Sequence, residues 1–444
     1  MTDTKRVSAL ASADLLASDD FLLIDSPTSG TRKYQASKLI AAAAAAQAAV
    51  LDDWSQAAAY IHAGLGPVYF PVASKANVPW STYATSSSAK AEYTLDFDSM
   101  HHSEEALASG ETLPVVHFQL HHCLPFDTQF SPYQAFIKAV TAIPAGTYNV
   151  KMGFSWGTNV VADKYYQFTL TQELPIGGVL TGFYGAPDNA PSSWKVYAYA
   201  SNAAATATET CAVTEGSGGT NLGTFTAAGV TVPASGTPDV TVVGSLQFYG
   251  LNSLHRVAYG DNRWLHSPLR QYLNKAGYDW WAPATVFDRP PAYSARQGFL
   301  SGFSDDFLAH VQKIERKTAL NYVTDGGTSG APEYDTTYDW FTLPSGREHF
   351  LADNSTFGGG QGREGAQWDY WKRASGSSSP LAWYGTYTQY IQYDLASPTT
   401  PRHVWMRSAH RGYGHYVARV ASSGGCHDGD AIHGFRCAPA CAIG

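Results

Sequence analysis

Charged residues are scarce in this sequence: they make up 15% of its 444 residues. Apolar residues make up 44%, which excludes intrinsic disorder as the general state of the chain. The net charge of −8 argues against a general nucleic-acid binder. The sequence also lacks any run of about 18 apolar residues, so we expect no membrane-spanning helix.

Cysteine is rare as well, and its odd number and irregular spacing do not indicate a disulfide framework in a chain of this size. The first six residues are Met-Thr-Asp-Thr-Lys-Arg, without the apolar core of a signal peptide. We therefore expect the protein to be made in a reducing cytoplasm. The cysteines are Cys123, Cys211, Cys426, Cys437 and Cys441.

Aromatic residues, in contrast, are abundant: 13% of the chain, including 12 Trp and 27 Tyr. Such a composition favours a β-rich protein with large buried or ligand-binding surfaces. The length allows about two to four domains with cores of their own. We expect a multidomain protein with boundaries at changes in local pattern.

The N-terminal part, residues 1–35, is expected to be an attachment element with a small β element in residues 7–35, followed by a helix in residues 36–64. Six alanines, residues 41–46, favour the helix strongly. Residues spaced alternately four and three positions apart then define an apolar seam along this helix. Gln47 lies within the seam and could set the register of a coiled coil. An oligomerisation helix is one interpretation and an ordinary amphipathic helix is the other. The seam comprises Ile40, Ala44, Gln47, Leu51, Trp54, Ala58 and Ile61.

The next two segments are predicted to be β-structured. Residues 65–128 are expected to form a β-rich connector, with histidine pairs at 101–102 and 121–122 beside Cys123. A metal site there is one hypothesis, although adjacent residues on a strand point to opposite faces. Residues 129–250 combine alternating apolar residues with regularly spaced turn clusters, which predicts an all-β sandwich-like domain.

Residues 251–444 concentrate tryptophan and carry three helix-start signals. Ser267 followed by Pro268 is an N-cap with proline at the first helical position. Ser304 precedes two aspartates at the start of a second helix. Residues 345–348, Ser-Gly-Arg-Glu, form a capping box for a third helix. With the glycine- and serine-rich loops between them, these signals predict an α+β domain.

The C-terminal segment also resembles the variable proteins of diversity-generating retroelements, as found in phages and prophages. The resemblance implies a C-type-lectin fold of the formylglycine-generating-enzyme type. It implies ligand binding rather than catalysis, with no cofactor and no metal. The motifs that carry it are residues 251–260, 262–264, 269–274, 288–291, 407–409 and 436–441.

In that family, a reverse transcriptase copies a template and randomises its adenines, and this mechanism predicts a pattern in the sequence. Randomising the adenines of asparagine codons leaves a pyrimidine in the third position, and such codons cannot encode Lys, Gln, Glu, Met or Trp. None of these residues occurs from 407 to 444. The fixed parts resemble residues 407–409, 411–412, 422–424 and 436–441, and the assignment of Ala418 and Cys426 stays open. The predicted variable, ligand-binding residues are His410, Tyr413, His415, Tyr416, Arg419, Ala421, Gly425, His427, Asp428, Gly429, Asp430, Ile432, His433 and Phe435.

Physical chemistry agrees with a binding surface. The His and Asp residues between 410 and 433 have no period that would bury them as one face, and burying so many would be costly. Tyr and His give large contact areas at low entropic cost. Two other interpretations remain open. A metal could bind His427, Asp428, Asp430 and His433, and Cys437 with Cys441 could form a redox pair or be small core residues.

Residues 7–10, 19–25 and 30–34 resemble the attachment end of phage tail fibres. Together these features predict a receptor-binding protein at a tail-fibre tip in the virion, a homotrimer that attaches to the tail or baseplate through its N-terminus. Its expected partner is a protein or glycan on the host bacterial surface. The alternatives are an enzyme, either a surface-polysaccharide depolymerase or a formylglycine-type oxidase, and a purely structural fibre protein. A depolymerase would need paired carboxylates in a groove, for which no cluster is evident.

Overall fold

The computed structural model shows a multidomain, β-rich chain with few helices. Of the predicted coiled-coil seam, Ile40, Ala44, Gln47 and Leu51 lie outside the described residues. The structure describes residues 21–24, 32–35, 53–132, 137–151, 165–176, 179–180, 194–198, 207–214, 221–230, 242–248, 260–284, 288, 290–323, 325, 333–350, 357, 363–375 and 385–444.

A short hairpin and a barrel are the first two β structures. Near the N-terminus, β1 (Phe21–Ile24) pairs antiparallel with β2 (Arg32–Gln35). Farther along, eight strands close into a barrel, in the order β10-β13-β6-β9-β11-β12-β8-β7. These strands are β6 (Ile137–Ala139), β7 (Gly146–Lys151), β8 (Tyr165–Leu170), β9 (Val179–Leu180), β10 (Trp194–Ala198), β11 (Ala207–Thr214), β12 (Asn221–Val230) and β13 (Val242–Phe248).

The prediction of a sandwich for residues 129–250 is therefore wrong in its architecture. The ring closes because β10 pairs with β13 on one side and with β7 on the other. Alternating apolar residues predict strands with one buried face, but they do not say whether the first and last strands meet. Each described strand of the barrel therefore has a partner strand on both sides.

A five-stranded sheet joins segments from both ends of the remaining chain, in the order β16-β22-β5-β4-β3. The last strand of the chain, β22, lies between β16 and β5: Cys441 is paired with Phe341 on one side and with Phe118 on the other. The strands are β3 (Lys75–Tyr83), β4 (Lys90–Ala106), β5 (Thr112–Leu120), β16 (Phe341–Thr342) and β22 (Ala440–Ile443).

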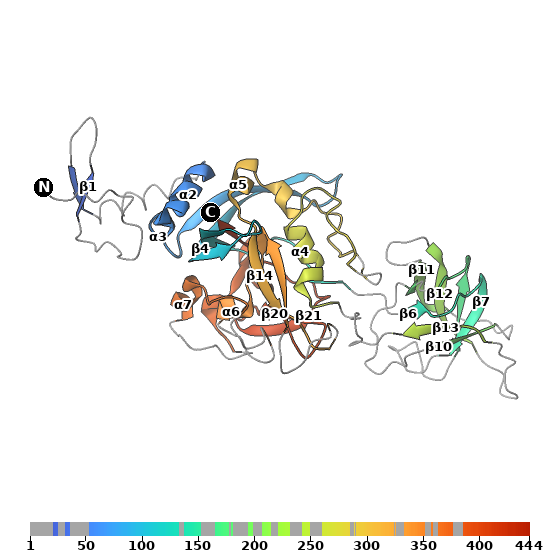
Figure 1. The fold of residues 1–444 in the computed structure, drawn as a ribbon. Coiled ribbons are helices and arrows are strands. Elements are labelled where there is room, and N and C mark those ends of the chain that lie inside the picture. Colours follow the sequence, from blue (N-terminus) through green and yellow to red (C-terminus); the bar gives the residue numbers. More distant parts are fainter. Residues whose placement is uncertain are drawn as a thin grey trace.

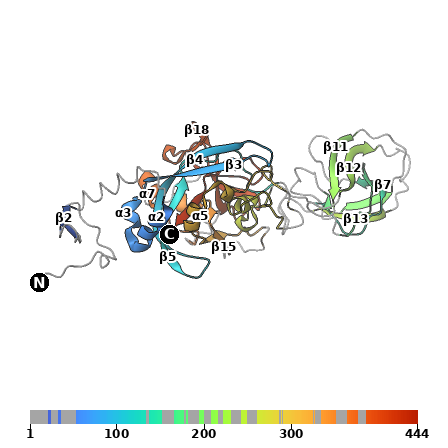
Figure 2. The same ribbon diagram turned by 90° about the horizontal axis from the view of Figure 1, so that it is seen from above.

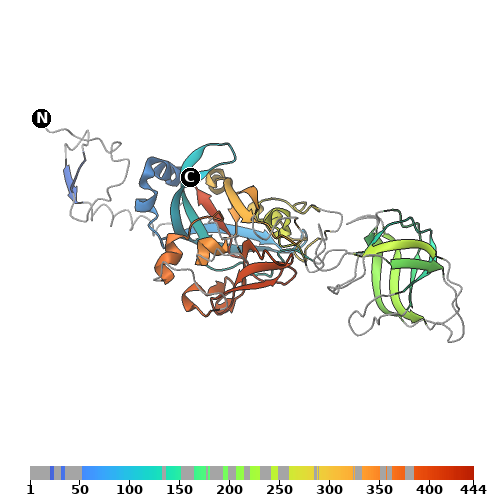
Figure 3. The same cartoon turned by 60° about the horizontal axis from the view of Figure 1, so that its bottom comes forward.

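This sheet corrects the predicted domain boundaries. Residues 65–128 are not a connector, because their strands form one sheet with the C-terminal segment. We call residues 53–132 and 260–444 together the head. The barrel is encoded between these two parts, and Figure 1 shows it in green as a body of its own next to the head. Figures 2 and 3 show the C-terminus inside the head, beside the N-terminal helices.

The other elements of the head are short. Three small antiparallel sheets are β14 (Ile314–Ala319) with β15 (Tyr334–Asp339), β17 (Gln392–Asp394) with β18 (Ser397–Arg402), and β19 (Val404–Ala409) with β20 (Tyr416–Val420) and β21 (Cys426–Asp430). The helical elements are α2 (Trp54–Tyr60), the π-helical turn η2 (Ile61–Leu65), α3 (Gly66–Tyr69), η3 (Trp264–His266), α4 (Pro268–Leu273), η4 (Phe299–Gly302), α5 (Asp305–His310), α6 (Gly346–Phe350), α7 (Asp369–Ser375) and η5 (Thr388–Tyr390).

All three predicted helix starts in the C-terminal segment are confirmed. Ser267 caps α4 by accepting a hydrogen bond from the Leu269 amide. Ser304 caps α5 in the same way. The capping box of α6 is complete, because the Glu348 amide donates to the Ser345 hydroxyl at 3.0 Å and the Ser345 amide donates to the Glu348 carboxylate at 2.8 Å.

The helix α2 belongs to the head. Trp54, Ala58 and Ile61 are buried, and the Trp54 ring meets Phe307 of α5 edge-on at 4.8 Å between centroids. These three seam positions therefore pack against their own chain instead of a second copy. The periodicity alone could not distinguish packing within the chain from packing against a second copy, because an apolar stripe can be buried on any apolar partner.

Aromatic side chains fill the core of the head. Trp264, Trp280 and Trp405 are 0% exposed and belong to one hydrophobic cluster with residues from both parts of the head. Burial of large rings on this scale makes hydrophobic contact the main stabilising term. Within the described part of the chain, no helix combines the length and apolar character needed to cross a bilayer.

Candidate functional site

Most of the predicted variable residues are brought together on and around the hairpin of β20 and β21. The two strands pair from Tyr416 with Asp430 to Val420 with Cys426. Residues 410–415 precede this hairpin and residues 431–435 follow it. We call the partly or fully exposed members of the set the hairpin surface. They are His410, Tyr413, Tyr416, Arg419, His427, Asp428, Gly429, Asp430, Ile432, His433 and Phe435.

One end of the hairpin surface is an aromatic group. Tyr413 is 46% exposed and lies at its centre. Its ring centroid is 4.9 Å from His410 and 5.2 Å from Tyr416. Rings that contact each other in this way stay ordered while offering their outer faces to a ligand.

The other end is built around Phe435. Its ring lies 4.6 Å from that of Trp405, and the guanidinium of Arg419 lies over it at 4.9 Å. The exposed His433 is 5.4 Å away on its outer side. Phe435 thus links the surface to the core, since Trp405 is fully buried.

Asp430 stands between two histidines. Its carboxylate is 3.5 Å from Nε2 of His415 and 3.7 Å from Nε2 of His433. Burial raises the pKa of Asp430, and burial together with the charge of His410 lowers the pKa of His415 to about 4. Among the described residues, no group of three or more His, Cys, Asp or Glu side chains is arranged to hold a metal ion.

Three predicted contact residues do not lie at the surface, and the structure corrects them. His415 and Ala421 are each only 4% exposed. Gly425 sits against the backbone of another segment, where a Cβ atom would clash with the carbonyl oxygen of Gly385. A side chain at Gly425 therefore cannot face a ligand. Ala418 and Cys426, whose assignment the sequence left open, are also buried.

The first of the motifs predicted to be fixed, residues 407–409, is buried. The guanidinium of Arg407 contacts both carboxylate oxygens of Glu348, at 2.5 and 3.1 Å, and donates to the Leu343 carbonyl at 2.9 Å. The Ser408 hydroxyl donates to Glu364 and accepts from the Gly346 amide. These contacts tie β19 to α6, so the motif supports the hairpin surface without being part of it.

Asn262 is a functional candidate that the sequence did not reveal. Its side-chain nitrogen donates to the carbonyls of His410, Tyr413 and Tyr416, at 3.0, 2.7 and 2.9 Å. Asn262 is fully buried and belongs to a motif matched only through the family resemblance. No spacing rule could have paired it with a loop about 150 residues away.

Of the two interpretations of Cys437 and Cys441, a redox pair or small core residues, the structure favours the second, because the two do not form a disulfide. Cys437 and Cys441 are free and buried, as are the other two cysteines whose side chains are described, Cys123 and Cys426. Burial raises the pKa of Cys437 to about 12 and also raises that of Cys441. A protonated thiol is a poor nucleophile, so both residues have the character of core side chains.

The histidine pairs of the five-stranded sheet also make separate contacts. Nδ1 of His101 lies 2.8 Å from a carboxylate oxygen of Asp369, whereas Nε2 of His102 lies 2.8 Å from the carbonyl of Phe70. Nδ1 of His121 lies 2.6 Å from Asp98. The neighbours in the 101–102 pair thus bind groups on different elements, as their alternation along a strand requires.

Comparison with known proteins identifies one family. Residues 239–444 are similar to a family described as "Domain of unknown function (DUF6273)". No curated protein and no solved structure matches the chain. The matched segment includes the hairpin surface and β22. The strand β5, which pairs with β22, lies before the matched segment. The segment therefore completes its sheet with residues 112–120.

Proposed function

We propose that this chain is a receptor-binding protein of a phage or prophage tail fibre, and that its hairpin surface binds a ligand on the host cell. One observation carries the proposal. Most residues of the motifs that the family resemblance marks as fixed are buried, whereas most residues that it marks as diversified are at least partly exposed on and around one hairpin. In this proposal the head is a variant of the C-type-lectin fold.

The chemistry of the hairpin surface suits recognition. Aromatic residues commonly dominate the energy of interfaces, and this surface offers Tyr413, Tyr416 and Phe435 in a fixed arrangement. Around them, His433 and Asp430 supply hydrogen-bonding groups. A preorganised surface of this kind loses little entropy when it binds.

Catalysis is the alternative from another class, as a polysaccharide depolymerase or a formylglycine-type oxidase. The oxidase would need a reactive thiol, and burial holds Cys437 and Cys441 in the protonated form. A depolymerase would need two carboxylic acids facing each other across a groove. Asp428 and Asp430 both lie on β21, next to histidine and arginine side chains. The arrangement thus supports binding better than catalysis.

The proposed fibre is a homotrimer in the virion, attached to the tail through the N-terminal segment. Trp54, Ala58 and Ile61 are used within the chain, so trimer contacts would come from the earlier seam positions, residues 40–51. Three heads on one fibre would raise the effective concentration of a weakly binding surface. Light scattering of the full chain should give three times 47.8 kDa, and a monomer at micromolar concentration would contradict the trimer.

The decisive test is a segment exchange. Residues 410–435 of a sibling variant would replace those of this chain, with His415, Ala421, Gly425 and Cys426 kept because they are buried. Adsorption of fibres or purified trimers to a panel of bacterial strains is then measured. Strain preference should follow the graft. If it stays with the rest of the chain, the hairpin surface is not the receptor site.

A matched control separates loss of folding from loss of recognition. A second graft would exchange only the exposed barrel turn at residues 171–173, which lies outside the head. It should leave strain preference unchanged. The gene sequence gives an independent test: a nearby near-repeat should carry adenines at the codons of the variable positions.

A further inference from the structure

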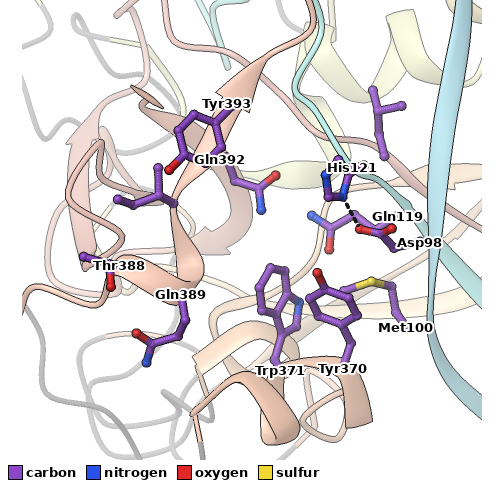
Figure 4. A pocket seen from close by; sticks show the side chains of 12 residues that line it. Asp98, Met100, Gln119, His121, Tyr370, Trp371, Thr388, Gln389, Gln392 and Tyr393 are labelled. Carbon is purple, nitrogen blue, oxygen red and sulfur yellow. Dashed lines mark hydrogen bonds and ion pairs between the residues drawn. The ribbon is translucent and has the colours of Figure 1, made fainter. Parts of the chain in front are cut away.

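A pocket away from the hairpin surface is lined by polar and aromatic side chains. It lies between β4 and β5 of the five-stranded sheet on one side and α7, η5 and β17 on the other, and its volume is about 200 Å³. Figure 4 shows the amides of Gln119 and Gln392 directed into the same space, with Tyr370 and Trp371 along one wall. Nothing in the proposed function uses this pocket.

Three buried polar atoms around the pocket have no hydrogen-bond partner among the described residues. They are Oε1 of Gln119, Oε1 of Gln392 and Nε1 of Trp371. The residues are only 3%, 6% and 3% exposed. A buried polar group without a partner costs roughly 1–3 kcal/mol. Three such groups at one cavity give a ligand that displaces water from it polar atoms with which to pair.

The charges at the pocket indicate a neutral ligand. Asp98 is the acidic residue in the lining, and its carboxylate is already paired with Nδ1 of His121 at 2.6 Å. A cationic ligand would have to compete with that histidine. An anionic ligand would face two amide oxygens and a carboxylate, which repel it. A hydroxyl group suits the site, because it can donate to an amide oxygen and accept from the indole N–H.

The walls indicate the shape of the ligand. Tyr370, Trp371 and Tyr393 supply aromatic surface. The Trp371 ring is held from behind by His349, with 3.8 Å between ring centroids, and by Tyr390 at 5.1 Å. A rigid indole face packs well against the C–H face of a small saturated ring. The cavity of about 200 Å³ is small, so the ligand that we infer is a single ring.

We infer that this pocket binds one neutral sugar residue in its pyranose form. Its hydroxyl groups pair with Gln119, Gln392 and the indole N–H of Trp371, and its apolar face packs on the aromatic wall. The inference does not depend on the hairpin surface, and it would hold if that surface had another role. It gives the head a second ligand site, built from residues outside the variable segment.

The test uses the full chain and a set of single sugars. Glucose, galactose, mannose and N-acetylglucosamine would each be added at 1–20 mM, roughly the range expected for a one-ring ligand of modest efficiency. Binding is followed by saturation-transfer NMR and by tryptophan fluorescence. At least one sugar should bind. If none binds, or if arginine or acetate binds in preference, the inference is wrong.

Two leucine variants make the test specific. Gln119→Leu and Gln392→Leu keep the approximate side-chain volume and remove the amide oxygen that has no partner. Each should weaken sugar binding at least tenfold while leaving the melting temperature of the free protein unchanged or higher. Trp371→Phe should weaken binding less, because it keeps a ring at the wall. A clear fall in melting temperature for both leucine variants would mean that the amides have partners within the protein.

The matched control is Asn77→Ala on the exposed face of β3. It should bind the same sugar with unchanged affinity, because Asn77 does not line the pocket. Equal loss of binding in Asn77→Ala and in the two leucine variants would overturn the inference.

Discussion

The side-chain nitrogen of Asn321 donates a hydrogen bond to the side-chain oxygen of Asn262 at 2.8 Å. This bond fixes the orientation of the Asn262 amide, so that its own nitrogen faces three backbone carbonyls between residues 410 and 416. The two asparagines thus anchor the loop that carries Tyr413. The loop that carries Tyr413 is therefore positioned by residues that lie outside the predicted variable segment.

Replacement of Asn262 by leucine should therefore destabilise the head. The change leaves carbonyls at the base of the loop without a donor, and we expect a loss of about 2–4 kcal/mol in the free energy of unfolding. Urea denaturation measures it. Asn77→Ala, on the exposed face of β3, is the control and should change stability by less than about 0.5 kcal/mol. Equal stability of the two variants would show that the Asn262 hydrogen bonds contribute nothing.

Tyr413 and Phe435 should respond differently to truncation. Tyr413 is nearly half exposed, so Tyr413→Ala should leave stability almost unchanged and weaken ligand binding. Phe435 packs on Trp405, and Phe435→Ala should cost about 1–2 kcal/mol, less than a fully buried ring. Trp405→Ala should cost about 3–5 kcal/mol. Thermal and urea unfolding of the three variants test this order, and a large loss from Tyr413→Ala would contradict it.

The stability of the head should depend on pH in the range below the ordinary pKa of histidine. Burial and the charge of His410 lower the pKa of His415 to about 4, whereas in the unfolded chain it is about 6.5. Between these values the unfolded state binds more protons, so stability is complete above pH 6.5 and falls as the pH decreases towards 4. Urea midpoints at pH 7.5, 6 and 5 should decrease in this order.

Two variants isolate the contribution of His415. His415→Gln removes the titrating group and should flatten the profile between pH 6.5 and 4. Tyr413→Phe changes a neighbouring ring without a group that titrates in this range, and should keep the wild-type profile. An unchanged slope in His415→Gln would assign the effect to other groups, such as His403, whose pKa burial also lowers to about 4.

Local signals in the sequence predicted local structure well. The caps at Ser267, Ser304 and Ser345 each depend on contacts within about three residues, and each is present. Pairings between distant segments could not be predicted in this way. Nothing near residues 440–443 indicates that β22 inserts between β16 and β5, because the partners lie about 100 and 320 residues earlier.

The same distinction between local and distant contacts applies to the candidate site. The motif pattern predicted a variable segment, and most of the residues that it predicted are at least partly exposed. It missed the burial of Gly425, which depends on the approach of the Gly385 carbonyl from another loop. It also missed the sugar pocket, whose lining comes from β4, β5, α7, η5 and β17 and has no common spacing in the sequence. Sequence patterns report residue type and local period, whereas burial depends on which distant segments meet.

The ion pair between Arg407 and Glu348 gives the last prediction. Burial opposes ionisation of Glu348, but the Arg407 guanidinium outweighs it and holds the pKa of Glu348 below its ordinary value. Arg407→Met should cost about 3–5 kcal/mol, because a buried carboxylate is left without its partner.

Glu348→Gln should recover part of that loss in the Arg407→Met background, about 1–3 kcal/mol. The glutamine removes the buried charge, while its side-chain oxygen can still accept from the Ser345 amide, so α6 keeps its cap. In the wild-type background the same change should destabilise, because it then breaks the ion pair. The wild type, the two single variants and the double variant form a double-mutant cycle, in which Glu348→Gln should have opposite effects on stability in the two backgrounds. The free energy of unfolding of each protein is measured by urea denaturation at pH 7.5. If Glu348→Gln has the same effect in both backgrounds, Arg407 and Glu348 are not coupled, and the fixed motif supports the hairpin surface by packing alone.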